Sequence, residues 1–322
     1  MLTIHGLSET HLVTSVLSSA PPPEGRPVWY DLLEPDEDED HLVEAALGIA
    51  VPTRDEMQEI EESSRLYEED GALYMTALIP FLFDTDDPRV TPVTFVLAGD
   101  RLVTVRYDRP RSFELFRIRA ERPGAGLIDG RSVLIGLLET IVDRLADGLE
   151  RIGGDLERLS LEVFRSRRER ERDLGDVITG IGRLGGALAR AEESLVTLSR
   201  LFHYLGEENG RERLDRDGKA RLATLELDAR SISEHAKSID ARLNFLLSAT
   251  LGLVGVEQNT IVKIFSVLAV IFMPPTLIAS IYGMNFHHMP EIDKVWGYPA
   301  ALGLMFASVA TTFAVFKWKR WL

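Results

Sequence analysis

Residues 264–286 read IFSVLAVIFMPPTLIASIYGMNF, and residues 295–316 read VWGYPAALGLMFASVATTFAVF. Neither stretch contains a charged side chain, and each is more than twenty residues long. A helix of about 20 apolar residues crosses the ~30 Å hydrocarbon core of a bilayer. The sequence before them is rich in charge. We therefore expect a large soluble body followed by a membrane hairpin, with Tyr282–Asn285 close to its turn.

The net charge of −15 is unevenly distributed along the chain. Residues 258–322 carry five Lys or Arg against two Asp or Glu, which is +3 and leaves −18 for residues 1–257. Such a body repels nucleic acid and attracts cations, although acidity is also ordinary for a soluble protein. The chain has no cysteine, so a zinc site would have to use histidine and carboxylate ligands.

The two ends of the chain predict its orientation in the membrane. Met1–Ser15 has neither a basic start nor a long apolar run, so we expect no signal peptide. After the second stretch, Lys317–Leu322 combines basic residues with tryptophan, a composition typical of the cytoplasmic side of a span. Two spans return the chain to the side it left. Both termini are therefore expected in the cytoplasm and the loop 284–294 outside.

The first 110 residues predict a mixed α/β domain. Val28–Leu33 is typical of a strand, and the ranges 65–78 and 93–107 each contain two apolar runs around a turn signal, which predicts hairpins. Leu42–Leu47 predicts a helix that ends at Gly48. We interpret the acidic run Asp36–Asp40 before it as a helix cap, since negative charge is favourable at a helix N-terminus.

After Ser112 the pattern is helical. Ser132–Arg168 and Leu174–Leu205 show helical spacing, and a polar break follows at Gly206–Gly210. One helix is expected from about Leu214 to Tyr282. Its upstream part carries a heptad seam, typical of a helix packed lengthwise against others: Leu222, Leu225, Ala229, Ile232, Ala236, Ile239, Leu243, Leu246, Thr250 and Leu253. The expected segments are a cytoplasmic α/β domain (1–130), a cytoplasmic helical stalk (131–257), a first transmembrane helix (258–283), an outer loop (284–294), a second transmembrane helix (295–316) and a basic tail (317–322).

Gly180–Gly185 matches the dinucleotide-binding pattern G-x-G-x-x-G. That fingerprint requires a preceding strand and a helix that opens at the glycines. Here it lies inside a helical pattern, so we interpret the glycines as helix-packing residues and reject nucleotide binding.

A stripe of polar and small residues runs along the first span. Two explanations stay open: contacts between packed helices, or the lining of a pore with polar mouths and an apolar constriction at Val262, Ala269 and Met273. The stripe itself comprises Asn259, Ser266, Met273, Thr276, Ser280 and Gly283.

Features around this stripe refine the expectation. Pro274 and Pro275 remove two backbone donors inside the span, which is tolerated in lipid only where other groups satisfy the freed carbonyls. The second span has small residues but no polar stripe, so we expect it outside, against lipid. Glu291 and Asp293 in the outer loop would concentrate cations.

Several motifs together resemble the CorA-type divalent metal transporters. They are Tyr282–Phe286 with its G-M-N signature, Met289–Glu291, Trp296–Pro299, the segment from Gly255 to Thr276, the basic Trp-Leu end, and Glu59–Gly71 in the soluble part. The resemblance covers most of the chain and is strongest from about Arg242 to Leu322.

The resemblance implies a funnel-shaped homopentamer with a cytoplasmic α/β/α domain, a long helical stalk and two C-terminal transmembrane helices. It implies passive uptake of Mg²⁺, often also of Co²⁺ and Ni²⁺, with no cofactor and no nucleotide or nucleic-acid partner. Gly283, Met284 and Asn285 would form the selectivity filter. Met273 would match a hydrophobic gate, and Thr276 and Asn259 polar pore positions. Val262 is smaller than the family's usual gate residue, so Phe265 is a candidate to fill that constriction.

The family also uses Mg²⁺ bound between subunits to favour closure, which requires acidic side chains on the stalk. The candidates here are Asp215, Asp217, Glu226, Asp228 and Asp240.

Three alternatives accompany the magnesium channel. A ZntB-like zinc transporter shares the signature, although Met289–Glu291 favours the magnesium branch. A membrane-anchored metal sensor without conduction would not need the polar stripe. We find no nucleophile–base pair, phosphate loop or metal-ligand cluster from which to build an enzyme.

Overall fold

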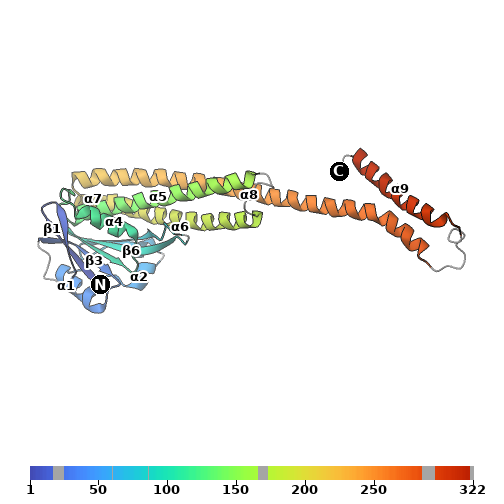
Figure 1. Cartoon of the computed structure of the whole chain (residues 1–322). Helices are drawn as coiled ribbons and strands as arrows, with labels where there is room; N and C mark the ends of the chain where they lie inside the picture. Colours follow the sequence, from blue (N-terminus) through green and yellow to red (C-terminus); the bar gives the residue numbers. More distant parts are fainter. Residues whose placement is uncertain (17–24, 60, 86, 166–172, 285–293, 320–322) are drawn as a thin grey trace. The chain divides into compact units, whose positions relative to one another are not determined.

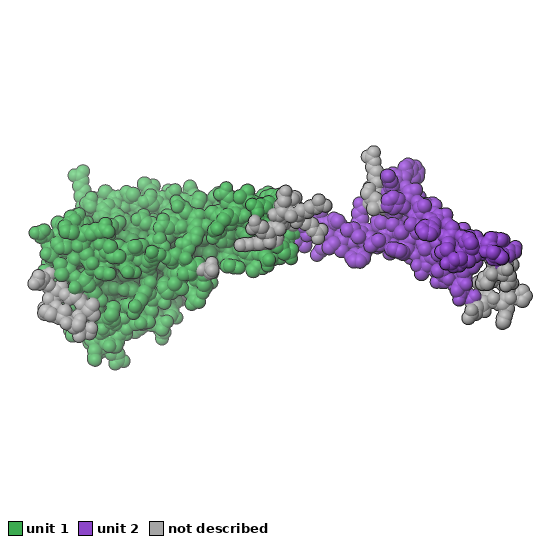
Figure 2. Space-filling view, viewed as in Figure 1, with its two compact units in different colours: residues 1–247 green, residues 248–322 purple. Residues whose placement is uncertain are grey.

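The structure is a computed structural model that describes all residues except 17–24, 60, 86, 166–172, 285–293 and 320–322. The chain divides into two compact units, residues 1–247 and residues 248–322 (Figure 2). The first unit holds the mixed sheet and most of the long helices. Among the described residues, two helices are long and apolar enough to cross a membrane; the second unit holds the C-terminal part of the first, Arg216–Tyr282, and all of the other, Gly297–Trp318.

Within the described residues, seven strands form one sheet in the order β2-β1-β3-β7-β6-β5-β4. The strands pair antiparallel except for β3 and β7, which run parallel. The two predicted hairpins are confirmed as β4–β5 and β6–β7, whereas the hairpin β1–β2 was not predicted. The strands are β1 (Leu2–Ser8), β2 (His11–Val16), β3 (Arg26–Leu33), β4 (Leu66–Glu69), β5 (Ala72–Phe81), β6 (Arg89–Ala98) and β7 (Arg101–Arg106).

The first helix shows how the acidic run acts locally. Asp36 accepts a hydrogen bond from the Glu39 amide, and Glu39 bonds back, which completes a capping box at the start of α1 (Glu37–Leu47). Gly48, with φ 68°, ends the helix in the left-handed conformation. The predicted cap is confirmed, but the helix begins five residues earlier than predicted, because the acidic residues after Asp36 form its first turn.

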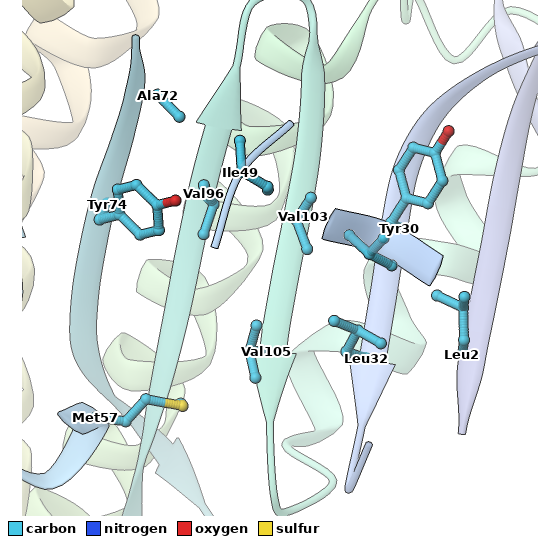
Figure 3. Close-up of a cluster of buried hydrophobic side chains, with 11 residues drawn as sticks. Leu2, Tyr30, Leu32, Ile49, Met57, Ala72, Tyr74, Val96, Val103 and Val105 are labelled. Atoms are coloured by element: carbon cyan, nitrogen blue, oxygen red, sulfur yellow. The ribbon is translucent and has the colours of Figure 1, made fainter. Parts of the chain in front are cut away.

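One face of the sheet packs against α1 and the short helix α2 (Arg54–Gln58), with α3 (Glu62–Arg65) leading into β4. Alternate residues of the strands, such as Val103 and Val105, point into this layer (Figure 3). The Tyr74 hydroxyl donates a 2.9 Å hydrogen bond to the Ala50 carbonyl, so the polar atom of this otherwise apolar side chain has a partner. The cluster comprises Leu2, Tyr30, Leu32, Val43, Ile49, Met57, Ala72, Tyr74, Val96, Val103 and Val105.

The other face of the sheet is covered by helices, so the predicted α/β/α arrangement is confirmed (Figure 1). The Ser194 hydroxyl, on α6, donates to the Leu78 carbonyl, and the Leu78 amide donates to the Thr197 hydroxyl. A short helix, α7, begins within the predicted polar break Gly206–Gly210 and extends beyond it. The helices here are α4 (Arg111–Ala120), α5 (Gly130–Phe164), α6 (Leu174–Gly206), α7 (Glu208–Arg213) and α8 (Arg216–Tyr282).

A buried polar chain lies beneath these helices. Arg106 holds Asp31 through two hydrogen bonds of 3.0 and 2.7 Å, and Thr104 donates to the same carboxylate. The Trp29 indole donates to Thr104, and the His5 ring stacks on the indole at 4.2 Å. Burial lowers the pKa of His5 to about 4, so the imidazole is neutral at neutral pH.

The glycine motif at 180–185 lies inside α6, with no strand before it, as the packing interpretation expected. A side chain at Gly180 would meet Leu159 of α5 at 3.2 Å, and one at Gly185 would meet Leu243 of α8 at 3.8 Å. Gly180 therefore allows close approach of α5 and α6, whereas a methyl group at Gly185 would make an ordinary contact and one at Gly182 would meet nothing within 4 Å. The predicted seam of α8 is confirmed over residues 222–250, where its members are buried except for the half-buried Ile232.

The second unit begins within α8 and ends with α9 (Gly297–Trp318). The apolar windows of these helices have mean hydropathy 2.2 and 1.7, with 0% and 6% of the residues buried. An apolar helix whose side chains are not buried within its own chain is suited to contact with lipid or with other helices in a membrane. The second helix starts and ends two residues later than predicted, so Lys317 and Trp318 belong to it.

Candidate functional site

The candidate site is the stripe on the membrane part of α8. The stripe follows steps of three and four along α8 and continues at Gly283, one residue past the helix end; its members within the helix are Asn259, Val262, Ser266, Ala269, Met273, Thr276 and Ser280. All of them are exposed, including Val262 at 61% and Met273 at 68%. The spacing places them on one face of the helix. Phe265 is also exposed, and it lies three positions after Val262 and four before Ala269, at the edge of the same face.

Hydroxyl groups on α8 bond back to the helix. The Thr276 hydroxyl donates to the Phe272 carbonyl at 2.8 Å, and the Thr260 hydroxyl donates to the Val256 carbonyl at 2.9 Å. The proton of Thr276 is used in this bond, so its oxygen presents lone pairs. Acceptor oxygens are suited to the water shell of a cation, whose hydrogens point outward.

Pro274 and Pro275 lie inside α8, which continues beyond them to Tyr282. Neither residue can donate a backbone hydrogen bond to the carbonyl four residues before it, which belongs to Val270 or Ile271. In a membrane these carbonyls need water or a neighbouring group. The double proline therefore adds oxygen acceptors at mid-span.

The end of α8 shows why glycine stands first in the G-M-N signature. The Gly283 amide donates to the Ala279 carbonyl at 2.9 Å, and the Met284 amide donates to the Ile281 carbonyl at 3.3 Å. A side chain at Gly283 would lie 3.1 Å from the Ala279 oxygen, tighter than an ordinary contact. Gly283 and Met284 are exposed. Asn285, Glu291 and Asp293 lie outside the described residues.

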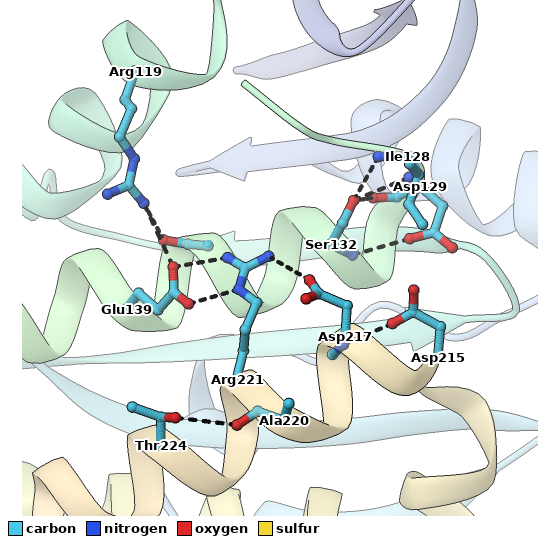
Figure 4. A network of polar contacts seen from close by, with 12 residues as sticks. Arg119, Ile128, Asp129, Ser132, Glu139, Asp215, Asp217, Ala220, Arg221 and Thr224 are labelled. Carbon is cyan, nitrogen blue, oxygen red and sulfur yellow. Dashed lines mark hydrogen bonds and ion pairs between the residues drawn. The ribbon is translucent and has the colours of Figure 1, made fainter. Parts of the chain in front are cut away.

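The acidic residues at and just before the start of α8 belong to a network of polar contacts (Figure 4). Arg221 binds Glu139 of α5 through two hydrogen bonds of 2.7 and 2.8 Å and lies 3.8 Å from Asp217. The hydrogen bonds that Arg221 donates to the Glu139 carboxylate raise the pKa of Arg221. Asp215 accepts a hydrogen bond from the Gly218 amide at 2.7 Å and so caps the helix. Both carboxylates therefore have partners within the chain.

The other three acidic candidates, Glu226, Asp228 and Asp240, are exposed. The Asp240 carboxylate accepts a 3.0 Å bond from the Asn244 amide, and Glu226 reaches over Gly206 at the end of α6. Burial raises the pKa of Asp143, and Asp228 is among the carboxylates that raise it further. In the part of the chain that the structure describes, no three His, Cys, Asp or Glu form a metal-binding group.

The pairing of Arg221 with Glu139 was not predicted from the sequence. The two residues are 82 positions apart, and each has the appearance of an ordinary charge on its own helix. A glutamate on α5 opposite an arginine on α8 becomes visible only when the packing of the two helices is known.

Comparison with known proteins places this arrangement in a family. A family model described as "CorA-like Mg2+ transporter protein" matches residues 24–320. The chain belongs to the CorA-like Mg²⁺ transporter family. It is 35% identical over 297 residues to the magnesium transport protein CorA of Escherichia coli K12, with 92% of each chain covered. The corresponding protein of Salmonella typhimurium is 34% identical over the same length and coverage.

Two solved structures share the fold of this chain. The complete structure of the CorA magnesium transporter from Methanocaldococcus jannaschii has a TM-score of 0.77 at 18% identity and covers 100% of this chain and 99% of its own. Full-length CmaX has a TM-score of 0.72 at 14% identity, with 100% and 98% covered. The predicted fold, a mixed-sheet domain with a long helix and two C-terminal membrane helices, is confirmed.

Proposed function

We propose that this chain imports Mg²⁺ passively through a pore lined by the stripe on α8. The observation that carries the proposal is the continuous, exposed, heptad-spaced face from Asn259 to Gly283, which ends at the family's G-M-N signature. Membership of the CorA-like family and the magnesium transport named for its relatives support the choice of ion.

The chemistry of the stripe suits a hydrated divalent cation. Mg²⁺ gives up its waters reluctantly, so a pore that leaves the shell intact needs acceptor groups for water, not a cage of carboxylates. Asn259, Thr276 and Ser280 supply such acceptors, and no acidic residue occurs between Lys263 and the outer loop. Gly283, Met284 and Asn285 form the selectivity filter in this proposal, and Glu291 and Asp293 attract cations to its mouth.

A stripe on one helix cannot enclose water by itself in a bilayer, so several copies must turn this face toward a common axis. The proposed assembly is a funnel-shaped homopentamer in a bacterial-type inner membrane, with both termini in the cytoplasm. In it, residues 1–130 form the α/β domain and 131–257 the stalk. Residues 258–283 line the pore, 295–316 face lipid, and the basic segment 317–322 lies in the cytoplasm.

The gate in this proposal is the apolar middle of the stripe. Val262, Ala269 and Met273 present no polar side chain, and a narrow apolar ring blocks ions by excluding water. Phe265 flanks the ring and can fill it after a small rotation of the helix. Cytoplasmic Mg²⁺ held by stalk carboxylates would favour closure, with Asp215, Asp217, Glu226, Asp228 and Asp240 as candidates.

Uptake into liposomes that contain the purified chain tests this function. Mg²⁺, Co²⁺, Ni²⁺ and Zn²⁺ are compared in turn, which separates the magnesium channel from a ZntB-like zinc transporter. A membrane-anchored sensor would pass none of them. The chain acts here as a transporter with no catalytic residue and no resident cofactor.

The decisive variant is Asn285→Ala. It should abolish uptake of Mg²⁺ and leave assembly intact, as judged by size-exclusion chromatography. Asn244→Ala is the matched control, since this exposed amide lies on α8 outside the stripe. Equal uptake by the Asn285→Ala variant and the wild-type chain would refute the filter assignment.

A further inference from the structure

A groove of about 720 Å³ lies in the first unit, lined by α5, α6 and the connection between β5 and β6. Its lining on α5 alternates arginine with acidic residues: Arg151, Asp155, Arg158, Glu162 and Arg165. Steps of four and three keep these residues on one side of the helix. Arg183 lines the groove from α6, so arginine side chains border it on both helices. All of its described lining residues lie within residues 1–247.

Arg151 and Arg183 are the arginines of this groove that have no ion pair or side-chain hydrogen bond with any described residue. Both are exposed. The lining carboxylates of α5 are each held by an arginine three residues later: Arg158 binds Asp155, and Arg165 binds Glu162 at 3.1 Å. The third lining carboxylate, Asp176, lies seven residues before Arg183 on α6, which is ~10 Å along the helix axis. The groove therefore offers two guanidinium groups to an anion that the described residues do not supply.

The packing of α5 against α6 sets the separation of these two arginines. A side chain at Gly180 would meet Leu159 at 3.2 Å, so these two residues face each other. Because α6 runs antiparallel to α5 (Figure 1), Arg183 lies at about the level of Leu156. That level is five residues, or roughly 8 Å, from Arg151 along the axis. Two guanidinium groups from different helices suit an anion with several oxygens, and the planar fork of arginine matches phosphate.

The rest of the lining indicates what else the ligand carries. The hydroxyl groups of the two lining threonines, Thr85 and Thr179, already donate to backbone carbonyls, so the arginines are the donors that the described lining offers. The Leu161 side chain, also in the lining, is 62% exposed. A ligand that satisfies the whole groove is therefore a phosphate ester with an apolar part, because the other lining residues are largely apolar: Phe83, Pro88, Ile152, Leu159, Leu184 and Ala187.

We propose that this groove binds an amphipathic phosphate ester, with its phosphate on Arg151 and Arg183 and its apolar part along the wall that includes Leu161. Anionic phospholipids and nucleotides share this chemistry. The site differs from a dinucleotide fingerprint, because its donors are side chains and not the backbone amides of a glycine loop. Since α5 and α6 each contribute one arginine, the ligand joins the two helices and stabilises the first unit. The inference does not depend on the proposed function.

Native mass spectrometry of the full-length chain in detergent micelles, without Mg²⁺, tests the site by counting bound molecules. The probes are ATP, dioctanoyl phosphatidylglycerol and inorganic phosphate. We expect one organic probe to bind once per chain, more tightly than phosphate. Arg151→Gln and Arg183→Gln should each weaken this binding about tenfold or more, which corresponds to ~1.4 kcal/mol. Arg230→Gln, at an exposed arginine of α8 outside the groove, is the matched control and should bind like the wild-type chain.

The two organic probes distinguish the sources of the phosphate. Binding of ATP alone identifies a nucleotide, and binding of phosphatidylglycerol alone identifies a lipid headgroup; either result supports the site when both glutamine variants weaken it. Arg183→Lys keeps the charge but not the planar fork, so it should weaken binding less than Arg183→Gln.

Three results overturn the inference: no binding of either organic probe, equal affinity in the wild-type chain and both glutamine variants, or phosphate bound as tightly as the organic probes. Circular dichroism checks that the variants keep their helices, which glutamine favours about as well as arginine. Equal loss of binding in Arg230→Gln would show a nonspecific effect of charge and would also overturn it.

Discussion

Acid should destabilise the first unit through His5. The imidazole is buried, stacked on Trp29 and bonded to the Thr14 hydroxyl at 2.9 Å, and burial lowers its pKa from 6.5 to about 4. Between pH 6.5 and about 4, His5 is therefore protonated in the unfolded chain but stays neutral in the folded state. The free energy of unfolding should be highest above pH 6.5 and fall as the pH drops toward 4, where the loss is complete.

The size of this loss follows from the two pKa values. A difference of about 2.5 units at 1.36 kcal/mol per unit gives about 3 kcal/mol. The nearby Asp31 and Glu121 raise the pKa of His5, while Arg117 and Arg106 lower it, so burial sets the direction.

Urea unfolding of the detergent-solubilised chain between pH 4 and pH 7.5, followed by tryptophan fluorescence, measures the effect. His5→Phe keeps an aromatic ring on Trp29 and removes the titrating group, so its stability should depend less on pH by about 3 kcal/mol over this range. His203→Gln is the control at an exposed histidine. Identical pH slopes for wild type and His5→Phe would refute the reasoning.

Further expectations concern packing, charge and gating. Gly130→Ala places a methyl group against the backbone of the neighbouring strand and should lower the free energy of unfolding by ~1–3 kcal/mol in urea titrations. Gly182→Ala, in open space within α6, should instead raise it by ~0.5–1 kcal/mol. Arg106→Met leaves a buried carboxylate unpaired and should cost about 3–5 kcal/mol by the same measurement. In liposomes, Met273→Gly should increase Mg²⁺ leak if that position gates, and an unchanged leak would remove it from the gate. Asp228→Asn should weaken inhibition by internal Mg²⁺, and full inhibition would exclude this carboxylate from regulation.

Long-range periodicity made much of the fold predictable. The seam of α8 repeats over more than four heptads, and its buried residues match the pattern through Thr250. The β4–β5 and β6–β7 hairpins were predicted because Gly71 and Gly99 mark their turns, both with positive φ. Glycine is the residue type that adopts positive φ readily, so its position in the sequence was enough to predict these two turns.

Other features carry no such local signal. The β1–β2 turn uses Glu9 with φ 53°, a conformation for which glutamate gives no indication. The start of α1 was placed late because acidic residues suit both a cap and a first turn. In the candidate site, the stripe was visible from its spacing, whereas its exposed state and the crowding at Gly283 required the structure.

The parallel pairing of β3 with β7 has a consequence for synthesis of the chain. The Trp29–Thr104 hydrogen bond across this pair joins residues 75 positions apart. A ribosome adding about 5–20 residues per second needs roughly 4–15 s to supply the second partner. Until then β3 presents an unsatisfied strand edge that any neighbouring nascent chain can pair with. The interval between these two strands is thus a stage at which this protein depends on protection from aggregation.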